Sequence, residues 1–144
     1  MITDYLNRQG SEPIKKKEQA QVISIASLRG DIRSKSMQVE KVVTAKQKDK
    51  LRAICRDLEK ASGLRGSDAD HAEAVRGRVA ASFKQATPEQ VDFLSVYVLN
   101  RMYAEGRWSV PQAVDKTQAL IQILSNVSKV LNDESGTSNI RKLG

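Results

Sequence analysis

Apolar residues recur from residue 44 onward at the three- and four-residue spacing of α-helices. The stretch 45–62 places its apolar side chains on one stripe, and 110–132 alternates four- and three-residue steps between leucines and other aliphatic residues. Shorter runs of the same kind cover 68–84 and 88–105. The pattern predicts four helices, at 45–62, 68–84, 88–105 and 110–132, with short connections. We therefore expect an all-α fold, a compact bundle of about four helices.

A hydroxyl residue precedes each predicted helix and stands three positions ahead of Gln or Asp. The hydroxyl can accept from backbone N–H groups of the first turn while the later side chain reaches back, which is the capping-box arrangement. The pairs are Thr44 with Gln47, Ser67 with Asp70, Thr87 with Gln90 and Ser109 with Gln112. Gly63 and Gly106 then stand where two of the helices need a left-handed closing residue.

The predicted helix 88–105 has almost no polar face, which places it at the centre of the core. A buried strand over 93–99 is the competing interpretation, because that run is rich in β-branched and aromatic residues. The Thr87-Pro88 start and the Gly106 stop favour a helix.

The predicted helix 110–132 carries more apolar surface than one face needs. Either the bundle covers this helix from two sides, or the helix also contacts another subunit. In the second case the partner-binding residues are Leu120, Leu124, Val127 and Leu131.

The first 43 residues lack this regularity. Residues 22–28 are apolar and 37–43 partly alternate, so each is compatible with a strand, a helix or a segment ordered by a partner. We predict a basic, partly ordered arm over 1–43, helical around 13–28, with a polar linker at 31–36. The helical domain is 44–132, and the polar stretch 133–144 is expected to be a mobile tail.

The formal net charge of the chain is +7, and residues 1–52 hold twelve Lys or Arg against six Asp or Glu. A polarised positive segment attracts polyanions through counterion release, so nucleic acid, above all DNA, is the leading candidate partner. A basic tail that only keeps the protein soluble is the alternative. The candidate nucleic-acid-binding residues are Lys15, Lys16, Lys17, Arg29, Arg33, Lys35, Lys48, Arg52 and Arg56.

Basic and aromatic residues also gather farther along the chain. Arg76 and Arg78 flank a glycine, and Arg101, Tyr103, Arg107 and Trp108 lie close together. Aromatics among arginines can stack on bases. Trp108 can instead act as a hydrophobic staple against Ala113, since it directly precedes a cap.

Groups that carry catalysis are scarce. One His and one Cys exclude the His/Cys zinc patterns, and Cys55 falls on an apolar stripe, where we expect a buried, inert thiol. His71 follows acidic residues that could bind a metal, although acidic residues in a first helical turn are equally expected from the helix dipole. There is no glycine-rich phosphate loop. We expect no enzymatic activity, no cofactor and no metal.

The composition places few limits on location. No run of about eighteen apolar residues and no charged-then-apolar leader occurs, so we expect neither a membrane span nor a secretory signal. A lone cysteine cannot form an internal disulfide, which agrees with a cytoplasmic protein.

Four short stretches between residues 43 and 94 carry a resemblance to a known family. They are Val43-Thr44-Ala45-Lys46-Gln47, His71-Ala72-Glu73-Ala74-Val75-Arg76-Gly77-Arg78, Phe83-Lys84 and Thr87-Pro88-Glu89-Gln90-Val91-Asp92-Phe93-Leu94. Together they resemble the small helical C-terminal module of phage antirepressors. Here the loop before the last helix of that module is shortened to Lys84-Gln85-Ala86, and the antirepressor N-terminal domain is absent. The resemblance implies a phage or mobile-element accessory factor and transfers no site residues.

These observations favour a non-enzymatic regulatory or accessory protein in a DNA transaction. The basic arm would bind nucleic acid, and the helical body would bind itself or a host or phage protein. The rival hypothesis is a protein-only adaptor or inhibitor of a host protein whose arm folds on binding.

Overall fold

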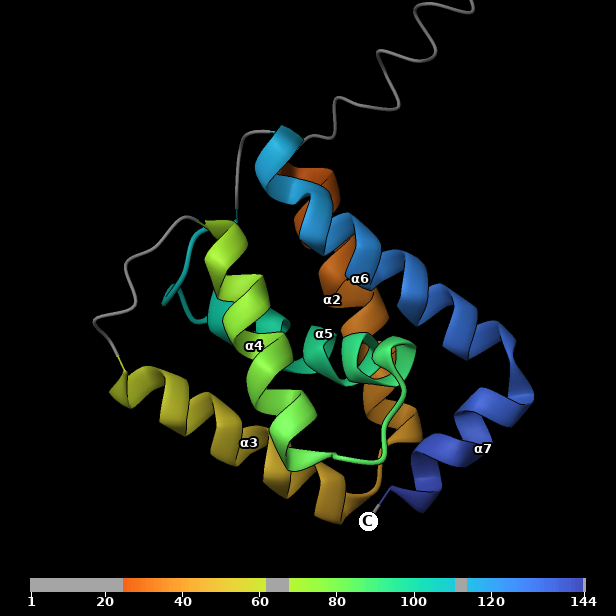
Figure 1. Ribbon diagram of the computed structural model, residues 1–144. Coiled ribbons are helices and arrows are strands. Elements are labelled where there is room, and N and C mark those ends of the chain that lie inside the picture. Colours follow the sequence, from red (N-terminus) through yellow and green to blue (C-terminus); the bar gives the residue numbers. More distant parts are fainter. Residues whose placement is uncertain (1–24, 62–67, 111–113, 144) are drawn as a thin grey trace, which may run out of the picture.

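The computed structural model describes residues 25–61, 68–110 and 114–143, and every regular element in these ranges is a helix (Figure 1). The all-α expectation is confirmed, but these ranges hold six helices where four were predicted. They are α2 (Ile25–Val42), α3 (Ala45–Lys60), α4 (Asp68–Ser82), α5 (Pro88–Ala104), α6 (Val114–Asn132) and α7 (Glu134–Lys142).

Helix α5 is the centre of the fold, as its uniform apolarity predicted. Every side chain from Gln90 to Leu99 is buried, and α5 packs against α2, α3, α4 and α6. Figure 1 shows α5 enclosed between α4 on one side and α2 and α6 on the other. The alternative of a strand over 93–99 is wrong, because this segment makes its backbone hydrogen bonds within the helix.

Helix α2 corrects the expected arm. The predicted polar linker at 31–36 is helical, and Leu28, Ile32 and Val39 on the same helix are almost fully buried. Arg33, Ser34 and Lys35, which have the composition of a linker, lie on the remaining faces of an amphipathic helix, whereas Ser36 is itself buried. The beginning of the predicted helix 13–28, up to residue 24, lies outside the described residues.

Two of the four predicted capping boxes are confirmed in full. In α3 the Thr44 hydroxyl accepts from the Gln47 N–H at 3.1 Å, and the Thr44 N–H donates to Gln47 Oε1 at 2.9 Å. Thr87 and Gln90 repeat this geometry at the start of α5. Gly106 has φ of 72°, which is the left-handed closing residue expected after α5. The boxes that begin at Ser67 and Ser109, and the closing residue Gly63, include positions outside the described residues.

The expected tail is also corrected, because residues 134–142 form helix α7. Ile140 is fully buried, and the Gln47 side-chain amide donates to the carbonyls of Ile140 and Leu143. Gln47 itself is 0% exposed. One glutamine therefore closes the capping box of α3 and also holds the end of α7 against the start of α3.

Candidate nucleic-acid interface

Helix α2 presents one face to the core and the opposite face to solvent. Its buried residues follow four- and three-residue steps: Leu28, Ile32, Ser36, Val39 and, just beyond the helix, Val43. This spacing fixes the rotation of the helix, so the residues on the far side of the cylinder must point outward.

The outward face is basic, small and partly apolar. A shallow hollow of about 300 Å³ runs along it, because Gly30 and Ser34 have little or no side chain there. Met37 is 54% exposed and is the one large apolar side chain so exposed among the described residues. The lining residues of this outer face of α2 are Gly30, Arg33, Ser34, Met37, Gln38 and Lys41, none of them acidic.

Arg29 lies beside this face on α2, and within the described ranges neither Arg29 nor the cations of the face are held in an ion pair. Within 25–61, 68–110 and 114–143, no carboxylate lies within ion-pair distance of Arg29, Arg33 or Lys41. Arg29 and Arg33 lie one turn apart and are both exposed. Exposed, unneutralised cations in a row are what a phosphate backbone requires.

The predicted residues on α3 are partly neutralised. Lys48 lies 3.9 Å from Glu40, and Arg52 lies 3.5 Å from Asp49. Arg56 is exposed on the same helix, whereas Lys35 of α2 is half-buried and turned toward α6. Of the predicted set, Arg29 and Arg33 therefore form the best-defined pair, and Lys15, Lys16 and Lys17 lie outside the described residues.

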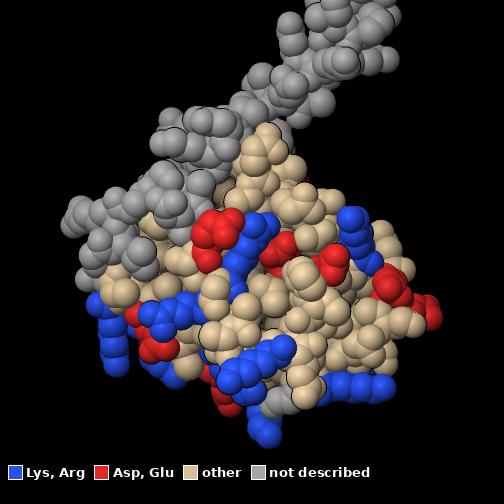
Figure 2. Space-filling model, viewed as in Figure 1, with Lys and Arg blue, Asp and Glu red and all other residues tan. Residues whose placement is uncertain are grey.

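Most of the excess positive charge of the first 61 residues lies within residues 25–61, which include α2 and α3, and little of it lies within residues 1–24. Residues 25–61 hold ten Lys or Arg against five Asp or Glu, whereas residues 1–24 hold four against three. On the face of the molecule shown in Figure 2, blue basic and red acidic side chains are interspersed. In that view α2 runs behind α5 and α6 (Figure 1).

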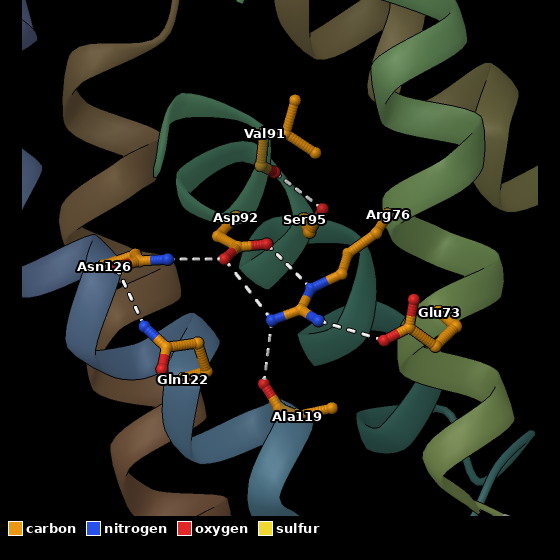
Figure 3. Close-up of polar contacts among 8 residues, drawn as sticks. All are labelled: Glu73, Arg76, Val91, Asp92, Ser95, Ala119, Gln122 and Asn126. Carbon is orange, nitrogen blue, oxygen red and sulfur yellow. Dashed lines mark hydrogen bonds and ion pairs between the residues drawn. The ribbon is translucent and has the colours of Figure 1, made fainter. Parts of the chain in front are cut away.

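Arg76 was a predicted candidate for contact with bases, but its guanidinium is bound within a polar network of α4, α5 and α6 (Figure 3). Its guanidinium donates to both carboxylate oxygens of Asp92, at 2.8 and 3.3 Å, and to the Ala119 carbonyl at 3.2 Å. The Asn126 amide donates to Asp92 at 2.7 Å. Because Asp92 is only 6% exposed, the network joins α4, α5 and α6 through a paired internal charge.

Three of the other basic and aromatic candidates, Trp108, Arg107 and Arg101, also have structural contacts. Trp108 stacks on His71 of α4 with ring centroids 4.2 Å apart, and Ala113, its predicted staple partner, lies outside the described residues. Arg107 pairs with Glu59 and with Glu105, and Arg101 pairs with Glu105 at 3.4 Å. This cluster joins the ends of α3, α4 and α5.

The predicted partner-binding residues divide into two groups. Leu120 and Val127 are 1% and 0% exposed, so they belong to the chain's own core and offer no surface. Leu124 and Leu131 are half-buried. Leu124 lines an open groove of about 440 Å³ between α2 and α6, whose other walls are Leu28, Asp31, Lys35, Ile121, Ser125 and Ser128.

Cys55 is buried as predicted, and burial raises the pKa of its thiol, opposed in part by the positive charge of Arg101. The described ranges hold no cluster of three His, Cys, Asp or Glu side chains suited to a metal ion. Nor does any helix in those ranges combine the length and the apolarity needed to cross a bilayer.

Comparison with protein-family models, with curated proteins and with solved structures finds no match to this chain. The resemblance of residues 43–94 to the antirepressor module stays a prediction.

Sequence reasoning missed most of the outer face of α2. Gly30, Ser34, Met37, Gln38 and Lys41 were not recognised, although a signal was present. Arg29, Arg33, Met37 and Lys41 repeat at four-residue steps, which places them on one helical stripe once residues 25–42 are taken as a helix.

Proposed function

We propose that this chain is a non-enzymatic nucleic-acid-binding protein that assists or regulates a DNA transaction, with the outer face of α2 as its binding surface. The observation that carries the proposal is a row of exposed cations on a helix of the core. The hollow along that face is lined by Arg33 and Lys41 and by no acidic residue, and the exposed Asp31 and Glu40 of the same helix lie outside that lining. The resemblance of residues 43–94 is the ground for a phage or mobile-element setting.

The proposed binding depends on counterion release and on a close approach of the nucleic acid to the backbone of α2. Arg33 and Lys41 can each neutralise a phosphate, while Gly30 and Ser34 leave room for the nucleic acid to approach the helix backbone. Gln38 carries an amide that can donate to and accept from a base edge. Since the backbone of α2 is held by its buried face, binding orders side chains but does not require the helix to fold.

Fluorescence anisotropy with labelled DNA tests the proposal. We expect Arg33→Gln combined with Lys41→Gln to weaken binding by about tenfold at low salt and to reduce the slope of log K against log salt by roughly 1.4 to 1.8. The matched control is Arg78→Gln with Lys84→Gln, which removes the same charge from exposed positions on and after α4. Equal losses in both variants would show that only net charge matters, and the proposed surface would be wrong.

A second comparison separates α2 from the preceding segment. Lys15→Ala, Lys16→Ala and Lys17→Ala remove three charges, one more than the α2 variant. We expect the α2 variant to lose more affinity, because Arg33 and Lys41 lie on one face of a helix whose other face is in the core. If the triple variant alone abolishes binding, the basic arm is the binding element and the α2 assignment fails.

The helical body is proposed to contact a second copy of the chain through the groove between α2 and α6. Asp31 and Lys35 both line this groove and are one helical turn apart. In a two-fold dimer each can face the opposite charge of the other subunit, which makes the groove self-complementary.

Charge exchange tests this contact by analytical ultracentrifugation. We expect Asp31→Lys or Lys35→Asp alone to weaken self-association, because like charges then face one another. A mixture of the two variants should form heterodimers, since each then meets its opposite. A wild-type chain that stays monomeric at high concentration contradicts the dimer and leaves nucleic-acid binding by α2 intact.

A further inference from the structure

A hollow of about 310 Å³ lies between α2 and the last turn of α5, beside the stripe of cations. Its lining residues are Arg29, Ile32, Arg33, Asn100, Tyr103 and Ala104. It is separate from the shallow outer face of α2, although Arg33 borders both. The volume lies at the lower end of the range for small-molecule sites, about 300 to 1,000 Å³.

The walls of the hollow differ in chemistry. Arg29 and Arg33 are exposed and stand on one rim, about 6 Å apart along the helix axis. Ile32 is 2% exposed and, with Ala104, supplies an apolar wall, while Tyr103 supplies an aromatic one. Asn100 is half-buried, and its side-chain amide carries both a donor and an acceptor.

This combination suits a nucleobase attached to a phosphate chain. The paired guanidiniums match successive phosphates of one strand, and the apolar and aromatic walls suit the face of a base. The Asn100 amide can pair with a base edge that offers a donor next to an acceptor. An isolated phosphate would gain nothing from the aliphatic wall of Ile32 and Ala104, and an apolar peptide side chain would gain nothing from the two arginines.

We infer that this hollow holds one unpaired base of a single strand whose phosphates lie on Arg29 and Arg33. The inference rests on the proposed function and deepens it, because it names single-stranded DNA as the preferred ligand. In a duplex the bases are stacked and paired, so a base must leave the helix before it can enter the hollow.

An abasic oligonucleotide separates the two parts of this site, since it keeps the phosphates and lacks the bases. We expect wild-type protein to bind a base-bearing single strand about tenfold more tightly than an abasic strand of equal length. It should also bind the single strand more tightly than a duplex of the same sequence, despite the lower charge density of the single strand.

Two substitutions, with a third as control, test whether the preference for base-bearing strands arises in this hollow. Ala104→Leu fills the hollow from an exposed position and should lower the affinity for the base-bearing strand to that for the abasic strand, with abasic binding unchanged. Ala81→Leu, at an exposed position on α4 that borders no described hollow, is the control and should change neither. Asn100→Ala should reduce the differences among homopolymers of adenine, cytosine and thymine.

The outcomes distinguish this inference from the proposed function. If abasic and base-bearing strands bind equally, or if Ala104→Leu behaves as Ala81→Leu does, the base site is wrong although α2 still binds phosphates. If neither single strands nor duplexes bind, both are wrong.

Discussion

Replacing Asp92 by alanine removes the acceptor on which α4, α5 and α6 converge (Figure 3). The Arg76 guanidinium loses two hydrogen bonds, of 2.8 and 3.3 Å, and the Asn126 amide loses one of 2.7 Å. Breaking a buried ion pair from one side costs about 3 to 5 kcal/mol. Glu73 remains 3.1 Å from Arg76, and the arginine side chain is 21% exposed, so we expect a loss near the lower limit, about 3 kcal/mol.

Urea denaturation followed by circular dichroism measures this loss. With a slope of about 2 kcal/mol per molar urea, the midpoint should fall by about 1.5 M, while the folded state stays the dominant one in water. Glu73→Ala is the matched control, because it removes the other carboxylate bound to Arg76 at a site that is 66% exposed. That change should cost about 0 to 1 kcal/mol.

A double-mutant cycle that adds Arg76→Ala then measures the interaction free energy between Arg76 and Asp92. We expect the two losses to be non-additive by roughly 1 to 3 kcal/mol, since each variant alone leaves the other charge without its partner. An Asp92→Ala loss below about 1 kcal/mol, or strict additivity, would refute the claim that this network joins the three helices.

Three further changes test other parts of the fold. Gln47→Glu keeps the capping acceptor but loses the amide that binds the carbonyls at the end of α7, and should cost about 3 kcal/mol in urea denaturation. Gln90→Glu, at the equivalent and also buried position of the other box, is the control and should cost less, because none of the described carbonyls accepts from its amide. Gly77→Ala should raise the melting temperature by about 3 °C, because its added Cβ meets no atom within 4 Å and alanine favours the helix. Burial raises the pKa of the Cys55 thiol, so the stability that this group contributes is present below the thiol's unfolded-state pKa and falls as the pH rises above it. Because the thiol is buried, a thiol reagent should react slowly with the native protein and rapidly with the protein unfolded in urea.

The centre of the fold was predictable from sequence because its signals are local. The start of α5 is predicted by Thr87, Pro88 and Gln90, which lie within four residues, and its end is predicted by Gly106. Helix α2 has a comparable but weaker signal. A serine at position 36 interrupts its buried stripe, and a glycine and several polar residues dominate its composition, so the segment resembles a linker.

The parts that could not be predicted depend on long-range partners. Asp92 stands out in an apolar run and must be paired, but its partners, Arg76 and Asn126, are 16 and 34 positions away. Helix α7 has Ile140 as its buried residue, and the amide that secures it comes from Gln47, which the sequence assigns only to a cap. Asn100 carries no sequence signal either, since its relevance comes from the packing of α5 beside α2.

The position of the cations on α2 lowers the ordering cost that we expect for the proposed binding. An arm that folds on its target would lose about 2 to 5 kcal/mol of interaction energy to ordering. Arg29 and Arg33 instead stand on a helix whose opposite face, including Leu28 and Ile32, lies in the core, so that ordering cost is already met in the free protein. The same packing against α5 creates the hollow beneath the two arginines. In the proposed mode of binding, one helix would therefore couple phosphate contact to base contact, and a strand held by the cations would have its bases next to the hollow without movement of the backbone.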